Sequence, residues 1–372
     1  MTNATTEGRT KGLFMSMEVS EARWHLAFTD LKEERFVSVD SWDQRGFTHE
    51  LQKAESHFGL EPGTPVYSCY EAGRCGFSIH RFLESKGIDN LVVDPASIEV
   101  NRRRKHKKTD RLDAEKLLRM LVRYRIYGER KCWQVCRVPS PQQEAARRLD
   151  REYDRLKKER KGHLSRIRAL LALHGVRVGS VYHLRPGTIK DWSGRLLAVA
   201  WQEEIGREME RLRVVDRQLS ALVKRMNEAI VRPKSEVDHI AWGLYQLRGI
   251  GVVGATALSR QFFGWREFNN VREVGAAAGL TGCPYDSGGS QVDQGISKAG
   301  HRRIRTLAVE LAWMWLRFQP TSALSQWYQE RFATGGKRLR RIGIVALARK
   351  LLVALWKYLH WGLIPQGAVI RM

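Results

Sequence analysis

The sequence has little that would tie it to a membrane or to an oxidising environment. No apolar run approaches the roughly 20 residues that a helix needs to cross a bilayer, and the first residues, MTNATTEGRTKG, lack the apolar core of a secretory signal. The five cysteines are scattered and odd in number, and none has the paired spacing of a zinc site. We therefore expect a cytoplasmic protein in a reduced compartment, with no membrane partner.

Acidic residues are scarce relative to basic ones. There are 64 Lys and Arg residues against 40 Asp and Glu, which leaves a formal net charge of +24 over 372 residues. Such an excess favours a polyanionic partner, and we expect a protein that binds nucleic acid. Because 43% of the residues are hydrophobic, the chain can bury cores in roughly two or three domains, and disorder is not expected.

The first part of the chain alternates between strand-like and helix-like patterns. Residues 1–12 are polar and form a disordered tail in this interpretation. Short β-branched and aromatic runs then predict a meander of three strands, followed by helices alternating with single strands. The predicted strands and helices are, in chain order, 13–20, 23–30, 35–42, 47–60, 65–73, 77–87, 90–94 and a helix beginning near Asp110. This order, βββαβαβα, predicts an α/β domain over residues 13–130, with helices on the faces of a mixed sheet.

The remainder is predicted to be helical. Residues 141–175 and 201–230 carry apolar residues at three-and-four spacing among dense charge, which is typical of long amphipathic helices. We interpret residues 131–235 as a coiled-coil arm with a Gly- and Pro-rich connector at 176–194; it could be a spacer, a dimerisation element or an RNA-holding element. Residues 236–372 are predicted to form a mainly α-helical domain.

Two aspartates in the stretch KKTDRLDAEK, Asp110 and Asp113, lie on one face of the predicted helix, in line with its buried stripe. One explanation is a capping box at the helix start. However, Glu18 lies in the first strand and Glu71 at the end of the fourth, and either could be an ordinary solvent-facing residue. Taken as a set, the four acids predict a shared divalent-cation site, because clustered carboxylates need such compensation.

Basic and glycine-rich segments are the candidate contacts to nucleic acid. The run NRRRKHKK precedes the acidic helix, LRGIGVVGATALS resembles a helix-hairpin-helix turn, and GGKRLRR is a third basic patch. The glycine segment could equally be a close-packed turn, and the alternative for the run NRRRKHKK, the stronger of the two signals, is a solvated loop. The patch GGKRLRR could contact RNA or the DNA backbone equally well. The residues that we expect to contact nucleic acid are Arg102, Arg103, Arg104, Lys105, Lys107, Lys108, Gly249, Gly251, Lys298, His301, Arg302, Arg303, Arg305, Lys337 and Arg338.

Taken together, these features resemble the DEDD-type transposases of insertion sequences, which are related to the invertases of pilin genes. The resemblance is carried by the strand acid, the strand-end EAG, the KTDRLDA motif, and the segments LRGIGVVGATALS, AAAGLTGCPYDSGGS and GISKAGHRRIRTLAVELAW. It extends over nearly the whole chain. The family's first acid is normally Asp in a strand like GIDVSK, whereas this chain has Glu18, and the longer side chain moves the charge about one carbon further from the strand.

The resemblance implies a RuvC-like domain of the RNase H fold, and it implies that Glu18, Glu71, Asp110 and Asp113 hold one or two Mg²⁺ ions for strand cleavage. It also implies that Ser287, in a Gly-rich loop before a basic helix, is a nucleophile that links covalently to DNA; from the residues alone Ser287 could be an ordinary loop serine, and Ser290 is the alternative. Family members are DNA recombinases programmed by a bridge RNA from the element itself. They bring the acids and the serine together from different subunits, which implies a dimer that pairs into a tetramer on target and donor DNA.

Two other functions remain open. A metal-dependent, structure-selective nuclease resembling a Holliday-junction resolvase would need only the four acids, and Ser287 would be incidental. A non-catalytic nucleic-acid-binding protein would use the acids merely as caps and solvated surface. Cleavage products that keep a covalent protein–DNA link would separate the recombinase from both.

Overall fold

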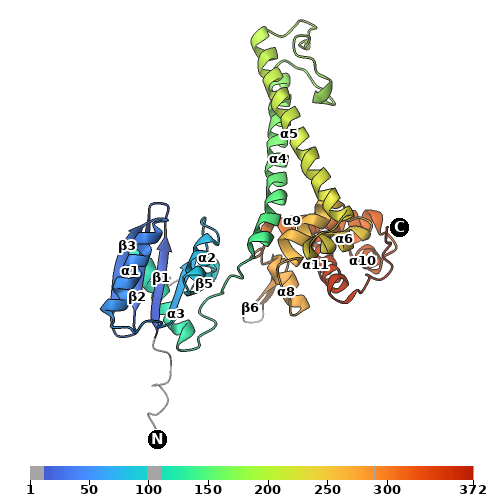
Figure 1. The fold of residues 1–372 in the computed structure, drawn as a ribbon. Coiled ribbons are helices and arrows are strands. Elements are labelled where there is room, and N and C mark those ends of the chain that lie inside the picture. The colour runs from blue at the N-terminus through green and yellow to red at the C-terminus, as the bar shows by residue number, and fades with distance from the viewer. Residues whose placement is uncertain (1–11, 99–109, 288–289, 372) are drawn as a thin grey trace. The chain divides into compact units, whose positions relative to one another are not determined.

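The computed structural model describes residues 12–98, 110–287 and 290–371 (Figure 1). The chain divides into two compact units, Met1–Val138 and Pro139–Met372, which are considered separately here. In the described part of the chain, no helix is both long and apolar enough to span a membrane.

The first unit is built on a five-stranded mixed sheet, as the sequence predicted. Its strands lie in the order β3-β2-β1-β4-β5, with β1 antiparallel to β2 and parallel to β4. The remaining pairs are β2 with β3, antiparallel, and β4 with β5, parallel. Its elements are, in order, β1 (Leu13–Val19), β2 (Arg23–Thr29), β3 (Glu34–Asp40), α1 (Gln44–His57), β4 (Val66–Glu71), α2 (Ser78–Ser85), β5 (Asp89–Val93), a 3₁₀ turn (Pro95–Ser97) and α3 (Asp110–Arg125). The predicted order βββαβαβα is confirmed, and the strand order is that of an RNase H-like fold.

The sheet is covered on both faces because its central strand is apolar on both sides. Successive side chains of a strand point to opposite faces. Leu13, Met15 and Met17 of β1 therefore pack with the helices α1 and α2, whereas Phe14 packs with α3. Residues up to Met17 are buried, and the strand becomes half-buried only at Glu18 and Val19.

The segment after α3 belongs to this same sheet. Trp133 is buried in the core with α3, and Val135 forms an antiparallel bridge with Val93 of β5. The Cys136 amide donates to the Val92 carbonyl at 2.7 Å. Residues 131–138, which the sequence analysis assigned to the arm, thus lie on the first unit.

Two long antiparallel helices open the second unit and form the predicted arm (Figure 1). They are α4 (Pro141–Ala172) and α5 (Val199–Val231). Helix α4 begins at a capping box, in which the Ser140 hydroxyl accepts from the Gln143 amide, and Pro141 occupies its first turn. Between the helices the described residues have only a 3₁₀ turn (Val181–His183) and an isolated antiparallel bridge between Lys190 and Leu196 as regular structure, as the Gly and Pro content of the connector predicted.

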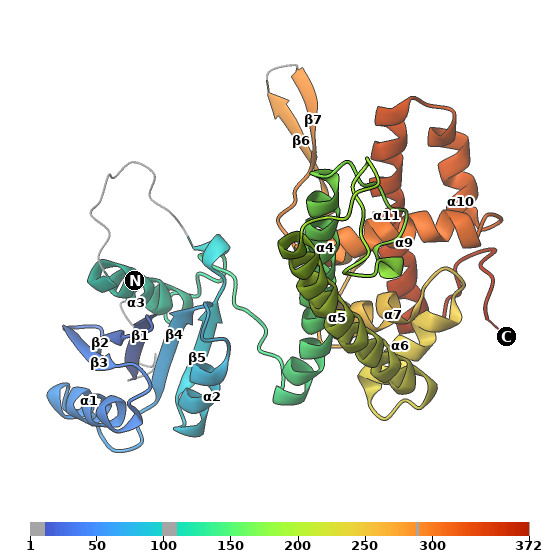
Figure 2. The same cartoon turned by 90° about the horizontal axis from the view of Figure 1, so that it is seen from above.

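The rest of the second unit is mainly helical, as predicted, with one β-hairpin. Its elements are α6 (Glu236–Gln246), α7 (Val252–Leu258), a π-helical turn (Ser259–Phe263), α8 (Val271–Ala277), β6 (Gly282–Ser287), β7 (Ser290–Ile296), α9 (Arg302–Phe318), α10 (Ala323–Tyr328), a second π-helical turn (Gln329–Ala333) and α11 (Lys337–Trp361). Apolar residues of α9 and α11, including Trp315 and Leu351, form the centre of its core. Figure 2 shows the hairpin projecting from these helices.

Candidate functional site

Glu18 and Glu71 lie side by side at one edge of the first unit's sheet. In the parallel pair β1 and β4, Met17 is paired with Tyr70, and Glu18 and Glu71 are the next residues on the two strands. Both side chains consequently project from the same face of the sheet, the face that α3 covers. Glu18 is half-buried and Glu71 is exposed, because the strands end here and leave the apolar core.

Asp113 is brought to the same place by helix α3. The Ser16 hydroxyl, two residues before Glu18 on the same face, donates to the Ala114 carbonyl at 2.5 Å. One turn further along, the Cys69 thiol, two residues before Glu71, contacts the Leu117 carbonyl at 3.7 Å. These two contacts attach the start of α3 to the strands that carry the glutamates, and so place Asp113 over them.

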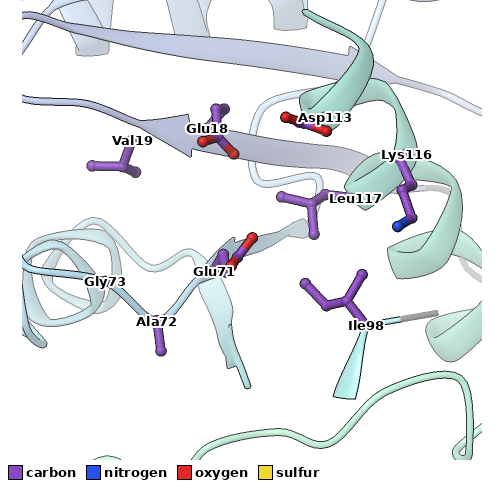
Figure 3. Close-up of a pocket in the computed structure, with 9 residues that line it drawn as sticks. All are labelled: Glu18, Val19, Glu71, Ala72, Gly73, Ile98, Asp113, Lys116 and Leu117. Atoms are coloured by element: carbon purple, nitrogen blue, oxygen red, sulfur yellow. The ribbon is translucent and has the colours of Figure 1, made fainter. Parts of the chain in front are cut away.

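Glu18, Glu71 and Asp113 line one open pocket of about 230 Å³. Their carboxyl groups point toward the same space, and the Lys116 side chain reaches into it from α3 (Figure 3). Apolar walls come from Val19, Ile98 and Leu117. Three of the four acids predicted from sequence therefore meet in one pocket.

Asp110 does not line this pocket. It is the first described residue of α3, is exposed, and lies 3.4 Å from the His25 Nε2 atom of β2. His25 is the cross-strand partner of Glu18, so Asp110 is connected to the site through a neighbouring strand. The sequence could not show this, because the position of His25 beside Glu18 depends on the register of β1 and β2.

The donor atoms of the pocket are suitable for a hard divalent cation, since they are carboxylate oxygens from separate elements. Their spacing is wider than that of a formed metal centre: within the described residues, no three or more acidic, histidine or cysteine side chains are close enough together to hold an ion. A cation bound here would have to draw Glu18, Glu71 and Asp113 together. Lys116 was not predicted from sequence, although its position three residues after Asp113 is a signal that the two share a helix face.

The basic run beside this site, with Arg102, Arg103, Arg104, Lys105, Lys107 and Lys108, lies outside the described residues. It precedes α3 directly in sequence.

Ser287 was expected in a loop, but it is the last residue of strand β6 in a two-stranded hairpin. The backbones of Ser287 and Ser290 are paired in register, and Gly288 and Gly289 lie outside the described residues. The sequence signal for a hairpin was present, because a Gly-Gly pair between two short runs containing Tyr285 and Val292 is typical of a tight β-turn.

The basic residues after the hairpin have structural contacts of their own. Arg303 forms an ion pair with Asp154 of the arm and donates to the Asp150 carbonyl at 3.2 Å. Arg305 donates to the Ala278 and Lys298 carbonyls at 3.3 and 3.0 Å. These arginines hold the start of α9 to the arm and to the hairpin's base, whereas Arg302 is exposed.

His301 is the N-cap of α9, and its Nδ1 atom accepts from the Ile304 amide at 3.4 Å. Burial, together with the nearby charges of Arg266 and Arg303, lowers the pKa of His301 to about 4. The imidazole is thus neutral at pH 7, and a contact from His301 to phosphate would be a hydrogen bond rather than the cationic contact expected from sequence.

The glycine-rich segment forms a tight turn between α6 and α7. Gly249 adopts a φ of 92°, a conformation that other residues rarely adopt, and an added Cβ would lie 3.2 Å from the Met314 carbonyl. Gly251 caps α7 with an ordinary φ of −82°, and nothing lies within 4 Å of its added Cβ. Two helices joined by a tight turn agree with the predicted helix-hairpin-helix turn, and its contact with DNA stays a prediction; of the two glycines, only Gly249 is required by the backbone.

The remaining predicted contacts are Lys298, Lys337 and Arg338 of the second unit. Lys337 and Arg338 are exposed in the first turn of α11, and Lys298 follows β7 with a positive φ of 56°.

The chain resembles known transposases over most of its length. Residues 243–329 match the model of the transposase IS116/IS110/IS902 family. A protein of Sinorhizobium fredii named as a transposase is 37% identical over 96% of this chain and 94% of its own length. The transposase for insertion sequence element IS1111A of Coxiella burnetii is 24% identical over 87% of this chain and 86% of its own. The transposase for insertion sequence element IS1533 of Leptospira borgpetersenii is 25% identical over 78% of this chain and 80% of its own. With its RNase H-like sheet and its acidic pocket, the chain belongs to the IS116/IS110/IS902 family of transposases, which are DNA phosphoryl-transfer enzymes.

Proposed function

We propose that this transposase is a bridge-RNA-guided DNA recombinase that cleaves DNA with Mg²⁺ and forms a covalent link between Ser287 and DNA. The observation that carries the metal-dependent part is the pocket in which Glu18, Glu71 and Asp113 meet. Carboxylates clustered at strand ends repel a phosphate anion, so such a site can bind phosphate only when a cation offsets that repulsion.

In this proposal Glu18, Glu71 and Asp113 hold one or two Mg²⁺ ions. Asp110, at the exposed start of the helix α3 that also carries Asp113, joins them. When bound, the metal supplies charge stabilisation at the scissile phosphate and at the leaving oxygen. The attachment of α3 to β1 through Ser16 and to β4 through Cys69 fixes the backbone that carries the three acids, so that only their side chains would have to move toward a cation.

A recombinase has to conserve the energy of the phosphodiester that it breaks. In the proposed step the Ser287 oxygen forms a bond to phosphorus while the bond to a deoxyribose oxygen breaks, and the serine proton ends on that leaving oxygen. Attack by the corresponding hydroxyl of another DNA end reverses the step and releases Ser287. Support comes from the resemblance of the sequence around Ser287 to the nucleophile segment of the family.

In this proposal, base pairing with a bridge RNA chooses the DNA sites. The net charge of +24 supplies cationic surface that can bind the backbones of the RNA and the DNA. Four strands are cut and rejoined in recombination. A dimer that pairs into a tetramer on DNA therefore fits the proposed reaction.

The test is strand cleavage of matched target and donor DNA by the purified protein with its element's RNA and Mg²⁺. Asp113→Asn should abolish cleavage, and Asp40→Asn should not, because Asp40 is an exposed acid on β3 outside the pocket. Ser287→Ala should abolish the protein–DNA adduct that survives denaturation, and Ser290→Ala should retain it. An adduct formed by the Ser287→Ala protein would refute the nucleophile assignment.

The same acidic pocket also favours a second candidate, a metal-dependent structure-selective nuclease, because it needs nothing from Ser287. Such an enzyme would leave hydrolysed ends and no adduct, and Ser287→Ala would cleave normally. Reprogramming separates the two further: changing the RNA loop that pairs with the target should redirect the recombinase to the new matched sequence.

A further inference from the structure

A groove runs along one face of helix α11 in the second unit, and none of its lining residues was assigned a catalytic role above. It encloses about 1190 Å³, more than the roughly 300–1,000 Å³ of typical small-molecule sites, and its lining residues on α11 run from Arg338 to Lys357, so it has room for an extended ligand. Its other walls come from the base of the β6–β7 hairpin and from α10. We call it the α11 groove.

The α11 groove is lined by cations and by no acid. The cations that line it are Lys298, Arg338, Arg341, Arg349, Lys350 and Lys357. Within the described residues, none of them forms an ion pair with a carboxylate. The arm differs, since Arg160 and Arg166 there pair with Asp216 and Glu208 at 2.7 and 2.9 Å. The positive charges of the groove are therefore available to an anionic ligand.

The floor between these cations is apolar. On α11 the lining positions recur every three or four residues, so cations and aliphatic side chains such as Ile342 and Val345 share one face. Ile342 is 50% exposed, and Lys350 lies 4.7 Å from the ring centroid of Trp327, which also lines the groove. Arg349 packs beside α8, where an added Cβ at Gly275 would lie 3.1 Å from its Nε atom.

We propose that the α11 groove binds single-stranded nucleic acid, with phosphates on its cations and bases on its apolar floor. A duplex keeps its bases stacked inside and has no apolar face to cover Ile342 and Val345, whereas a single strand presents both groups at once. From Arg338 to Lys357 the α11 face is roughly 29 Å long, which spans at most about eight nucleotides at 3.4 Å each.

The groove's position favours a nucleic-acid strand over an acidic amphipathic helix. Gly282, Gly295 and Ile296 at the base of the hairpin line it, and the hairpin's first strand ends at Ser287. A strand in the α11 groove therefore continues toward the segment that bears the proposed nucleophile. This inference rests on the proposed function in that the bound strand is DNA or RNA of the reaction.

The test measures binding of fluorescein-labelled single-stranded dT20, U20 RNA and a 20-base-pair duplex to the full chain in 100 mM KCl with EDTA. Because EDTA prevents metal-dependent cleavage, loss of the catalytic proposal would leave this measurement unaffected. The groove variant is Arg338→Gln with Arg341→Gln. Its control, Arg317→Gln with Arg340→Gln, removes two exposed arginines that do not line the groove.

The groove variant should bind the better single strand about tenfold more weakly than the control does, with duplex binding equal in the two proteins. Its slope of log affinity against log salt should fall by about 1.4, since each single-strand phosphate contact contributes about 0.7. Ile342→Ser should weaken single-strand binding about threefold or more without changing that slope, because it removes only apolar floor.

Tighter binding of dT20 than of U20, or the reverse, identifies the strand as DNA or as RNA. Equal losses in the groove variant and its control, parallel loss of duplex binding, or unchanged binding by the Ile342→Ser protein would each overturn the proposal. If single-strand binding is unchanged both in the groove variant and in the Ile342→Ser protein, the α11 groove binds a protein ligand instead.

Discussion

The Ser16 hydroxyl donates to the Ala114 carbonyl at 2.5 Å, which joins the strand that carries Glu18 to the helix that carries Asp113. Both residues are buried, at 0% and 1% exposure. Ser16 lies two positions before Glu18, and Ala114 directly follows Asp113. The relative position of Glu18 and Asp113 consequently depends on a hydrogen bond between two residues that do not line the pocket themselves.

Removing this hydrogen bond should separate positioning from stability. Ser16→Ala should lower the free energy of unfolding by about 1 kcal/mol and slow cleavage by roughly 10- to 100-fold, because Asp113 loses its fixed place over the strands. Urea unfolding and single-turnover cleavage are the measurements. Ser68→Ala is the matched control: Ser68 is equally buried, its hydroxyl contacts Asn90 at 2.7 Å, and it points to the sheet's other face. The positioning role is refuted if both variants cleave equally well.

The acid at position 18 should matter through its charge more than through its length. Glu18→Gln should lower the cleavage rate by about 100-fold or more, since a neutral amide binds Mg²⁺ more weakly than a carboxylate does. Glu18→Asp should retain Mg²⁺-dependent cleavage within about tenfold, because a carboxylate remains in the pocket. Rates measured across a Mg²⁺ titration would show the difference. Glu21→Gln, an exposed acid outside the pocket, serves as the control and should cleave normally. Normal cleavage by the Glu18→Gln protein would remove Glu18 from the metal site.

The turn between α6 and α7 offers a pair of glycines that differ in conformation and in surroundings. Gly249→Ala should lower the free energy of unfolding by about 1–3 kcal/mol, because the residue needs a positive φ and its new Cβ would crowd the Met314 carbonyl. Gly251→Ala should leave stability within about 0.5 kcal/mol, since its φ is ordinary and its surroundings are open. Thermal unfolding of both variants checks this. If Gly251→Ala nevertheless weakens duplex binding, the open side of the turn contacts DNA.

Glu208 should make the arm sensitive to acid. Burial raises the pKa of this carboxyl, but hydrogen bonds from His163, Arg166 and Arg211 outweigh burial and lower the pKa to about 2 from its ordinary value of 4.5. A depressed carboxyl pKa stabilises the fold above about pH 4.5, and this contribution, at most about 3 kcal/mol, is lost as the pH falls toward 2.

Glu208→Gln should therefore destabilise the protein at pH 7 and flatten the decline of stability between pH 4.5 and 2, as measured by urea unfolding across that range. The control is Glu203→Gln, which removes an exposed carboxylate of the same helix, 3.8 Å from Arg207, and should cost a few tenths of a kcal/mol. Identical pH profiles for wild type and the Glu208→Gln protein would show that Glu208 titrates normally.

The element order of the first unit and the helical character of the second could be predicted from local patterns in the sequence. Strand periodicity and helix spacing depend on near neighbours in the chain, and that local pattern indicated the strand containing Glu18, the strand ending at Glu71 and the helix starting at Asp110. The glycine turn at Gly249 was also readable, because the need for a positive φ is a property of one residue.

Which side chains meet in the site depends on tertiary packing. The parallel register of β1 and β4 placed Glu18 beside Glu71, and the packing of α3 added Asp113 and Lys116 while leaving Asp110 with His25. Such pairings follow from the burial of apolar faces across long stretches of chain, a nonlocal free energy that no short motif encodes. For the same reason the α11 groove was invisible in the sequence, since its walls come from segments that approach one another only when the core of the second unit forms.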